Sequence, residues 1–553
     1  MMCDSGIRNE IAGLSADRSS RQADSLGSLH LSPAQNQWWF ETATAEAGEL
    51  YGYTRELSLP VGDPIELRLH GTVGLVEVQI RRDDGRSRPV FQQREVSARA
   101  QATEPRPYRD GCGWQVGLAV DTKGWEPGPY LIRISAEDQS WVQWHHWIAL
   151  RPPRLGSNRL TLVVPTCTWN AYNGWGGASS YDGIAEGGFS AELSFDRPFQ
   201  RGTFWLPAGA PRNSAPPYAS NGHVAYPWTD WAFSHGVGKH YASAGWATFE
   251  RNFFIWAEAN GYGVDLITQH DLHFESEILF EAGPLIFAGH DEYWTWEMRD
   301  AVDRFVDAGG QVARLAGNFL WQVRLSADGL LQTCFKERAL TNDPVRGTPA
   351  RRHLLTYGWD FPEIGYPAAK TFGCSGARGM YAGFGGLVRH GPGGMTVYRP
   401  EHWMLDGTEL GYGDVLGTTG RIGTYEVDGL DIVIRDGLPY PTGCNGIAPE
   451  SASIVAMCLA SNVELGYGTP PAHLDVGDRD RALIASIRHG EVTAESLDSA
   501  GRGCGVMGEY RRADGRVVFA AASEWVNGLR LGDPWVERVT HNILRALSET
   551  SAG

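Results

Sequence analysis

The sequence predicts an α/β protein built on a mostly parallel sheet with helices on both faces. Three observations predict this class: short continuous apolar runs that suit buried strands, amphipathic segments of helical period, and the alternation of the two along the chain. The composition agrees, because 42% hydrophobic and 20% charged residues are typical of a globular protein and exclude a disordered, collagen-like or coiled-coil chain. The 553 residues are enough for three or four domains of roughly 150 residues each.

The first 30 residues are rich in Ser, Asp, Arg and Gly, and we expect a flexible leader over residues 1–45. Over residues 46–155 the pattern changes to short runs that alternate polar and apolar residues between turns. The runs are 65–69, 73–80, 114–118, 130–134 and 141–148. This alternation predicts a small antiparallel, immunoglobulin-like β-sandwich. The alternative is an irregular β appendage without a core of its own.

Residues 156–553 show the strand and helix series of a parallel sheet. Continuous apolar runs at 160–164, 264–268, 285–288 and 312–315 suit strands that are buried on both faces. Two amphipathic helices are predicted at 249–259 and 297–308, and each ends at a glycine-containing pair. Because strands and helices alternate, we expect one large α/β domain with crossover connections.

The stretch from about residue 330 to 440 is rich in turn residues, and we interpret it as a β-rich insertion in this domain. A separate domain at this place is the alternative. Apolar runs return at 454–459 and 517–522, and a last amphipathic helix is predicted at 535–548.

Charge and cysteine content indicate which partners and which cellular compartment to expect. The chain carries 48 basic and 65 acidic residues, a formal net charge of −17, so a nucleic acid would be repelled and is not an expected partner. The eight cysteines are scattered without a CxxC motif, which is typical of free thiols in a reducing compartment. No secretory signal and no membrane-spanning apolar run is found in the sequence. We therefore expect a soluble cytoplasmic protein without a membrane partner.

Unusually polar and aromatic residues follow the predicted strands, where the active sites of open parallel sheets lie. His290, Asp291 and Glu292 place a base and two carboxylates in one strand-to-helix corner. Because neighbouring side chains diverge at such a turn, we expect only two of the three to face a common pocket. A carboxylate that caps the following helix is the alternative for Asp291 or Glu292.

Several common catalytic templates are missing. The sequence has no GxSxG nucleophile elbow, no HExxH zinc motif, no phosphate-binding GxxxxGK[ST] loop and no GxGxxG after a strand. These absences argue against an elbow-type serine hydrolase, a zinc metalloprotease, a P-loop enzyme and a dinucleotide-binding enzyme.

Six ordered segments together carry a resemblance that none of them carries alone. They are NAYNGWGGASSY (170–181), SFDRP (194–198), GHDEYW (289–294), AGN (316–318), HW followed by GTEL (402–410) and YEVDG (425–429). With these segments the chain, from about residue 158 onwards, resembles the C-terminal domain of the large (beta) subunit of N,N-dimethylformamidase.

The resemblance implies a glutamine-amidotransferase-like α/β domain that holds one Fe(III) ion through two tyrosines and a glutamate. Glu292 matches the glutamate ligand, Tyr172 the first tyrosine and Tyr218 the second. Tyr181 is the rival of Tyr172, and Tyr226 is the rival of Tyr218. His290, Asn318 and Glu426 match residues around the metal. Cys167, where such a fold can carry a nucleophile, lacks an elbow context, and we interpret it as a small buried residue.

The implied ligand set is chemically consistent. Phenolate and carboxylate are hard anionic donors that suit Fe(III), and such an ion polarises an amide carbonyl and acidifies bound water. Glu426 or His290 would take the proton of that water, and Asn318 would orient the amide or stabilise an oxyanion. The expected function is an iron-dependent amidohydrolase that cleaves the C–N bond of a small N-substituted amide or formamide to an acid and an amine. The alternatives are a non-catalytic ligand-binding homologue and a different C–N bond cleavage at the same metal.

The resemblance also bears on partners and on the size of the pocket. We expect a homo-oligomer with a possible small accessory subunit, since the family works with a separately encoded small helical subunit. Ala316 stands where the resemblance places a bulky aromatic side chain, which implies a wider pocket and a substrate larger than dimethylformamide. Which amide is bound stays open.

Overall fold

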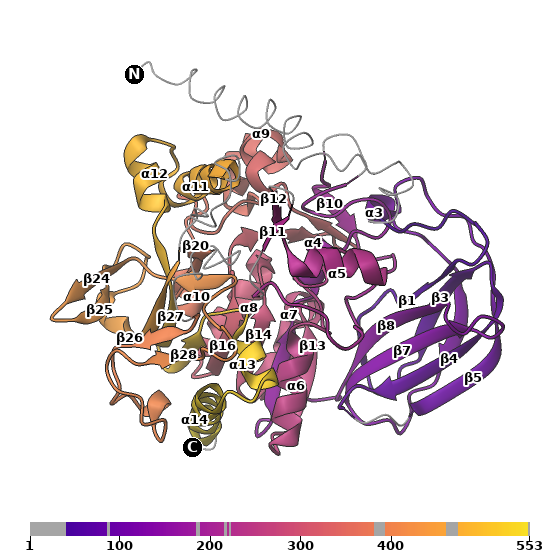
Figure 1. Cartoon of the computed structure of the whole chain (residues 1–553), viewed down its shortest axis with the longest axis horizontal. Helices are drawn as coiled ribbons and strands as arrows, with labels where there is room; N and C mark the ends of the chain where they lie inside the picture. Colours follow the sequence, from indigo (N-terminus) through magenta and orange to yellow (C-terminus); the bar gives the residue numbers. More distant parts are fainter. Residues whose placement is uncertain are drawn as a thin grey trace.

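The computed structural model describes residues 40–85, 89–183, 188–214, 218–220, 223–380, 393–460 and 474–550. A β-rich part (indigo to purple) lies on one side of the molecule, and a larger part with strands and helices forms the rest (Figure 1). Residues 1–39 of the expected leader lie outside the described residues.

Two sheets form the β-rich part. Their strand orders are β1-β3-β6 and β2-β8-β7-β4-β5, and all pairings are antiparallel except that of β2 with β8. The sheets enclose an apolar core of their own, which contains Ile132 and Trp144 and also Trp175 from the following α/β part. Strands β3, β4, β6, β7 and β8 overlap the five alternating runs. The bounds are β1 Leu50–Tyr53, β2 Ser58–Pro60, β3 Ile65–Gly71, β4 Gly74–Arg82, β5 Pro89–Ala98, β6 Val116–Val120, β7 Gly128–Ala136 and β8 Gln143–Arg151.

A nine-stranded sheet with the order β13-β9-β14-β16-β28-β27-β26-β21-β22 organises the α/β part. Its first five strands are parallel, whereas the pairings from β28 to β22 are antiparallel. The sheet is therefore mixed. The bounds are β9 Leu160–Val164, β13 Val264–Thr268, β14 Leu285–His290, β16 Gln311–Gly317, β21 Met395–Val397, β22 Val415–Leu416, β26 Ala452–Ala460, β27 Gly503–Arg512 and β28 Gly515–Ala520.

The antiparallel half has a local cause. Only Ala513 and Asp514 separate β27 from β28, and a two-residue turn joins antiparallel strands, since a parallel pair needs a much longer crossover. The expectation of a mostly parallel sheet rested on the series from β9 to β16, where helices supply those crossovers.

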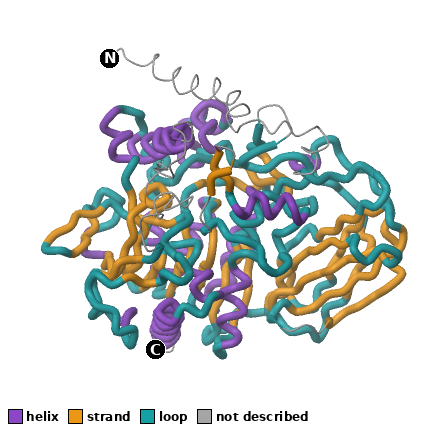
Figure 2. Tube along the Cα trace, in the orientation of Figure 1, coloured by secondary structure: helices purple, strands orange, loops and turns teal. Residues whose placement is uncertain are grey.

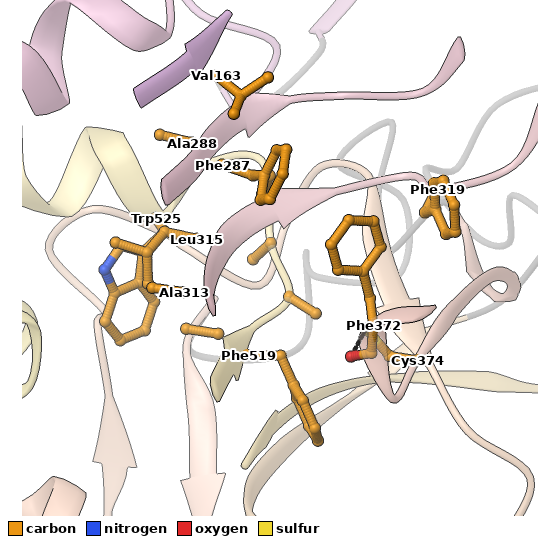
Figure 3. Packing of buried hydrophobic residues seen from close by; sticks show 14 of the residues in the cluster. Val163, Phe287, Ala288, Ala313, Leu315, Phe319, Phe372, Cys374, Phe519 and Trp525 are labelled. Carbon is orange, nitrogen blue, oxygen red and sulfur yellow. Dashed lines mark hydrogen bonds between the residues drawn. The ribbon is translucent and has the colours of Figure 1, made fainter. Parts of the chain in front are cut away.

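Helices cover both faces of this sheet. α6, α13 and α14 pack together and against β14 and β16, while α8 packs with α7, α10 and β28. Neighbouring residues of a strand point to opposite faces of the sheet. Figure 3 shows a helix residue at each face: Trp525 of α13 lies beside Ala313 and Leu315, and Phe372 of α10 lies on the side of Phe287. The bounds are α3 Pro107–Asp110, α4 Thr166–Tyr172, α5 Pro227–His235, α6 Glu250–Ala259, α7 Gln269–Phe274, α8 Trp296–Asp307, α9 Ala339–Asn342, α10 Ala369–Phe372, α11 Leu474–His489, α12 Ala494–Ala500, α13 Trp525–Arg530 and α14 Pro534–Thr550.

The stretch 330–440 is built into the α/β part. Its strands β21 and β22 complete the nine-stranded sheet, and β19 pairs with β10, which precedes it by more than a hundred residues. Long loops connect these short strands (Figure 2). The remaining strands are β10 Glu192–Ser194, β11 Tyr218–Ser220, β12 His223–Ala225, β15 Tyr293–Trp294, β17 Trp321–Gln322, β18 Arg324–Leu325, β19 Leu331–Thr333, β20 Ser375–Met380, β23 Val427–Gly429, β24 Ile432–Arg435 and β25 Leu438–Pro441.

Two further findings concern the described ranges as a whole. None of their helices is both long enough and apolar enough to cross a membrane. Their seven cysteines, residues 112, 167, 334, 374, 444, 458 and 504, are all free thiols.

Candidate functional site

The carboxyl edge of the parallel strands brings the predicted site residues together. His290 ends β14 and Asn318 directly follows β16, and the pairing of His290 with Gly317 makes the two ends neighbours. Tyr172 ends α4, the helix that follows β9, and Glu426 directly precedes β23. The position agrees with the rule that open sheets bind ligands beyond the carboxyl ends of their strands.

Three tyrosine hydroxyls and one carboxylate form a tyrosine–glutamate cluster, which consists of Tyr172, Tyr181, Tyr293 and Glu292. The Tyr172 hydroxyl donates to Oε2 of Glu292 at 2.9 Å, and the Tyr181 hydroxyl lies 2.9 and 2.8 Å from the two carboxylate oxygens. The Tyr293 hydroxyl donates to that of Tyr181 at 2.7 Å. The rings of Tyr172 and Tyr181 stack with centroids 4.3 Å apart. Oxygen atoms thus converge on Glu292 from two segments of the chain.

Burial, followed by the negative charge of Glu292, raises the pKa of Tyr172, Tyr181 and Tyr293 well above the usual value of 10. The three phenols therefore carry their protons in this arrangement and donate them in hydrogen bonds. A cation bound among the same oxygens would oppose this effect, because positive charge favours the phenolate form.

His290 is held as a neutral base. Its Nδ1 faces the backbone carbonyl oxygen of Ser243, an atom that only accepts, so Nδ1 carries the proton and Nε2 the lone pair. Nε2 accepts from Nδ2 of Asn318 at 3.2 Å and lies 3.6 Å from Oε2 of Glu292. Burial lowers the pKa of His290, so the imidazole is uncharged near pH 7.

Asn318 and Glu426 occupy strained backbone positions. Their φ angles are +67° and +43°, in the left-handed region that residues other than glycine rarely adopt. The Oδ1 atom of Asn318 is buried and has no hydrogen-bond partner among the described residues. Such strain and such an acceptor both occur preferentially at functional sites.

A close backbone contact brings Glu426 to the end of β16. A Cβ atom on Gly317 would lie 1.9 Å from the carbonyl oxygen of Glu426, so only glycine permits this approach. Ser523 holds the same oxygen through its backbone N–H and its hydroxyl, both at 3.0 Å. Glu426 itself is 3% exposed, and the contact places it beside Asn318.

Asp291 turns away from the cluster into a buried ion-pair network with Arg314 and Asp428. Arg314 donates to Oδ2 of Asp291 at 3.0 Å and to Oδ2 of Asp428 at 3.1 Å. Oδ1 of Asp428 accepts from the backbone N–H of Phe319 at 2.9 Å. The network therefore joins the segments that carry Glu292, Asn318 and Glu426. As expected for a strand-to-helix corner, two of the three residues 290–292 face the site; helix α8 is capped by Thr295.

The tyrosines expected from the sequence have different locations. Tyr172 contacts Glu292, and so does Tyr181, its rival. The Tyr218 side chain lies outside the described residues. The ring of Tyr226 packs on Trp228 at 4.7 Å in a separate apolar cluster. Sequence reasoning missed Tyr293, although it stands in the GHDEYW segment beside Glu292.

Cys167 has the environment of an unreactive thiol. It is fully buried, its N–H donates to Gln269 at 2.9 Å, and burial raises its pKa, which disfavours the thiolate nucleophile. Within the described ranges, no group of three or more His, Cys, Asp or Glu residues could hold a metal ion. Glu292 and the tyrosine hydroxyls around it are the candidate donors at this place.

The tyrosine–glutamate cluster fits a small hard cation. Its phenol and carboxylate oxygens lie 2.8 to 2.9 Å apart, at hydrogen-bond length, so the side chains already gather their oxygens at one point. The donors are all oxygens and include a carboxylate, which suits Fe(III) better than a soft metal.

Comparisons with known proteins show the family of this chain. Residues 78–540 match the family model described as N,N-dimethylformamidase beta subunit-like, C-terminal. The N,N-dimethylformamidase beta subunit of Paracoccus aminophilus is 25% identical over 202 residues, and that of Alcaligenes sp is 27% identical over 192 residues; each alignment covers 32% of this chain. The match spans only 24% of the length of each relative. The family match confirms the resemblance: the chain belongs to the N,N-dimethylformamidase beta subunit-like, C-terminal family.

Proposed function

We propose that this protein is a hydrolase that cleaves the C–N bond of a small N-substituted amide or formamide to a carboxylic acid and an amine. The observation that carries the proposal is the convergence of the Tyr172 and Tyr181 hydroxyls on Glu292, next to the neutral Nε2 of His290. The names of the two relatives, both N,N-dimethylformamidase beta subunits, support an amide substrate.

A mononuclear Fe(III) would be held by Glu292 and Tyr172, with Tyr181 or Tyr218 as the second tyrosine. When bound, such an ion polarises a carbonyl and makes water acidic enough to supply hydroxide near neutral pH. The convergence of the Tyr172 and Tyr181 hydroxyls on Glu292 supports this ligand choice.

The chain's own residues would then move the protons. Nε2 of His290 is unprotonated and accepts from the side-chain amide of Asn318, so it can take a proton from the attacking water once that amide turns to the substrate. Glu426 is the other candidate base. Either group can return the proton to the departing nitrogen. The side-chain amide of Asn318 would orient the substrate carbonyl or stabilise the oxyanion, a role worth about 3 kcal/mol.

The fold name and the assembly state belong to the proposal as well. The parallel half of the sheet, covered by helices on both faces, supports a glutamine-amidotransferase-like α/β domain. The relatives are named beta subunits, which supports an assembly with an accessory subunit. A homo-oligomeric state and a cytoplasmic location belong to the proposal as expectations from the sequence.

The proposal is tested by iron analysis, visible spectroscopy and substrate turnover on the purified protein. We expect about one iron per chain, a tyrosinate-to-Fe(III) charge-transfer band, and amine release from a panel of formamides, acetamides and ureas. A protein without iron or colour would overturn the metal assignment. Ligand binding without any amine release would favour a binding protein over a hydrolase.

A further inference from the structure

Lys336 places an ammonium group against the tyrosine–glutamate cluster. It is the first residue of the 3-10 helix Lys336–Arg338 and is 7% exposed. Its Nζ lies 3.5 Å from the centre of the Tyr181 ring and 5.3 Å from that of Trp321. Tyr172 stacks on Tyr181 as well, and two groups in such close contact with one ring must occupy opposite faces. Tyr181 is thus held between Tyr172 and a positive charge.

Among the residues that the structure describes, the charge of Lys336 has no acidic partner at ion-pair distance. A lysine this buried is normally paired with a carboxylate, as Lys239 is with Asp182 at the same site. For Lys336, no carboxylate within the described ranges lies at ion-pair distance. Attraction to aromatic faces recovers only part of the cost of removing an ammonium from water. A second, anionic group is therefore needed to complete its surroundings.

The backbone of Lys336 has a fixed and strained conformation. Its φ angle is +52°, a strained value for a lysine, and its N–H donates to the carbonyl oxygen of Thr356 at 3.1 Å. The chain has only four lysines, residues 123, 239, 336 and 370; Lys336 contacts Tyr181, and Lys239 pairs with Asp182, the next residue. An ammonium, unlike a guanidinium, is a compact point charge that can meet a carboxylate from many directions.

We infer that Lys336 binds a carboxylate of the substrate, so that the amide hydrolysed here is itself an acid of the N-acyl amino acid type. This inference rests on the proposed amide hydrolysis. The ammonium lies 3.5 Å from the centre of the ring whose hydroxyl contacts Glu292, so the substrate carboxylate would lie close to the amide, as it does in an N-acyl amino acid. The net charge of −17 repels anions at long range, so a local cation has to provide the recognition.

Binding of two probes that differ only in charge tests the inference. Isothermal titration calorimetry on the purified protein compares N-acetylglycine with its methyl ester. We expect the acid to bind about 10- to 100-fold more tightly, the range of one charge-assisted hydrogen bond. Lys336→Met should abolish this preference, Lys336→Arg should keep much of it, and Lys123→Met, the same change at an exposed lysine of the β-rich part, should keep all of it.

Parallel turnover assays separate this inference from the proposed function, with formate release from N-formylglycine and its methyl ester as the readout. A carboxylate preference that depends on Lys336 but occurs without turnover would refute amide hydrolysis and leave the anion site intact. Turnover of both compounds with equal KM, or a preference that survives in a folded Lys336→Met protein, would overturn the anion site alone. Circular dichroism establishes that the variants are folded, and Lys336→Gln replaces Lys336→Met if the latter is not.

Discussion

Nε2 of His290 lies 3.6 Å from Oε2 of Glu292, and the two side chains are buried, with 0% and 3% of their surface exposed. A neutral imidazole and a carboxylate at this distance, beside two phenol hydroxyls, form an arrangement that can hold a cation and accept a proton. Glu292 is the centre of this arrangement, because both Tyr172 and Tyr181 donate to it.

Replacement of Glu292 by alanine should remove the iron together with the activity. Loss of the carboxylate to which both tyrosines donate leaves phenols whose pKa burial alone still raises, which disfavours the phenolate form. Elemental analysis should give less than a tenth of the wild-type iron, with the visible band lost. Glu450→Ala, at an exposed glutamate, is the control. Full iron in the Glu292 variant would refute the ligand assignment.

Replacement of Glu426 by glutamine should keep the iron and slow turnover. Glu426 is brought to the site through a backbone contact with Gly317 and is assigned to proton transfer, which contributes about 10²- to 10⁴-fold to rate. We expect kcat to fall within that range while the charge-transfer band is unchanged. Loss of iron in this variant would instead make Glu426 a ligand.

Replacement of Gly317 by alanine should disturb the site more than the fold. The added Cβ would lie 1.9 Å from the carbonyl oxygen of Glu426, so the 426–428 segment has to move away from β16, at a cost of about 1–3 kcal/mol. We expect kcat/KM to fall at least tenfold. Gly347→Ala, where a Cβ meets nothing within 4 Å, should behave like wild type. Unchanged activity in the Gly317 variant would contradict the close contact.

Replacement of Arg314 by methionine should strongly destabilise the protein. Asp291 and Asp428 would be left buried without a counter-charge, and breaking such a pair costs about 3–5 kcal/mol. Urea unfolding should show this loss. The triple variant with Asp291→Asn and Asp428→Asn should regain part of it. Arg352→Met, which breaks an exposed pair with Glu363, should cost about 1 kcal/mol or less.

His146 should make stability fall in acid. Burial lowers its pKa to about 3, while the unfolded chain has the ordinary value near 6.5. Between these pH values the unfolded state binds more protons, so the free energy of unfolding decreases as the pH falls, by about 1.4 kcal/mol per pH unit for this group. His146→Gln should reduce the slope measured by urea unfolding between pH 6.5 and 5, and His235→Gln, at an exposed histidine, should not.

Local patterns in the sequence were sufficient to predict many of the strands and helices. The apolar runs at 160–164 and 264–268 are β9 and β13 with unchanged bounds, because a strand buried on both faces has a continuous apolar sequence with sharp ends. The helix predicted at 535–548 is α14, one residue longer at its N-terminal end and two at its C-terminal end. The antiparallel strands β21 and β22 were not predicted, since two or three residues carry no periodic signal.

For the candidate site as well, some contacts could be predicted from the sequence and others could not. The sequence by itself determined that His290, Glu292 and Asn318 meet, because each follows or ends a strand and parallel neighbours end at one edge. Only the tertiary structure decided that Tyr181 and Tyr293 join Glu292, that Arg314 binds both Asp291 and Asp428, and that Lys336 lies on the Tyr181 ring. The physical reason is that these contacts join residues from separate loops and strands, whose side-chain directions depend on the packing of the whole domain and not on local sequence period.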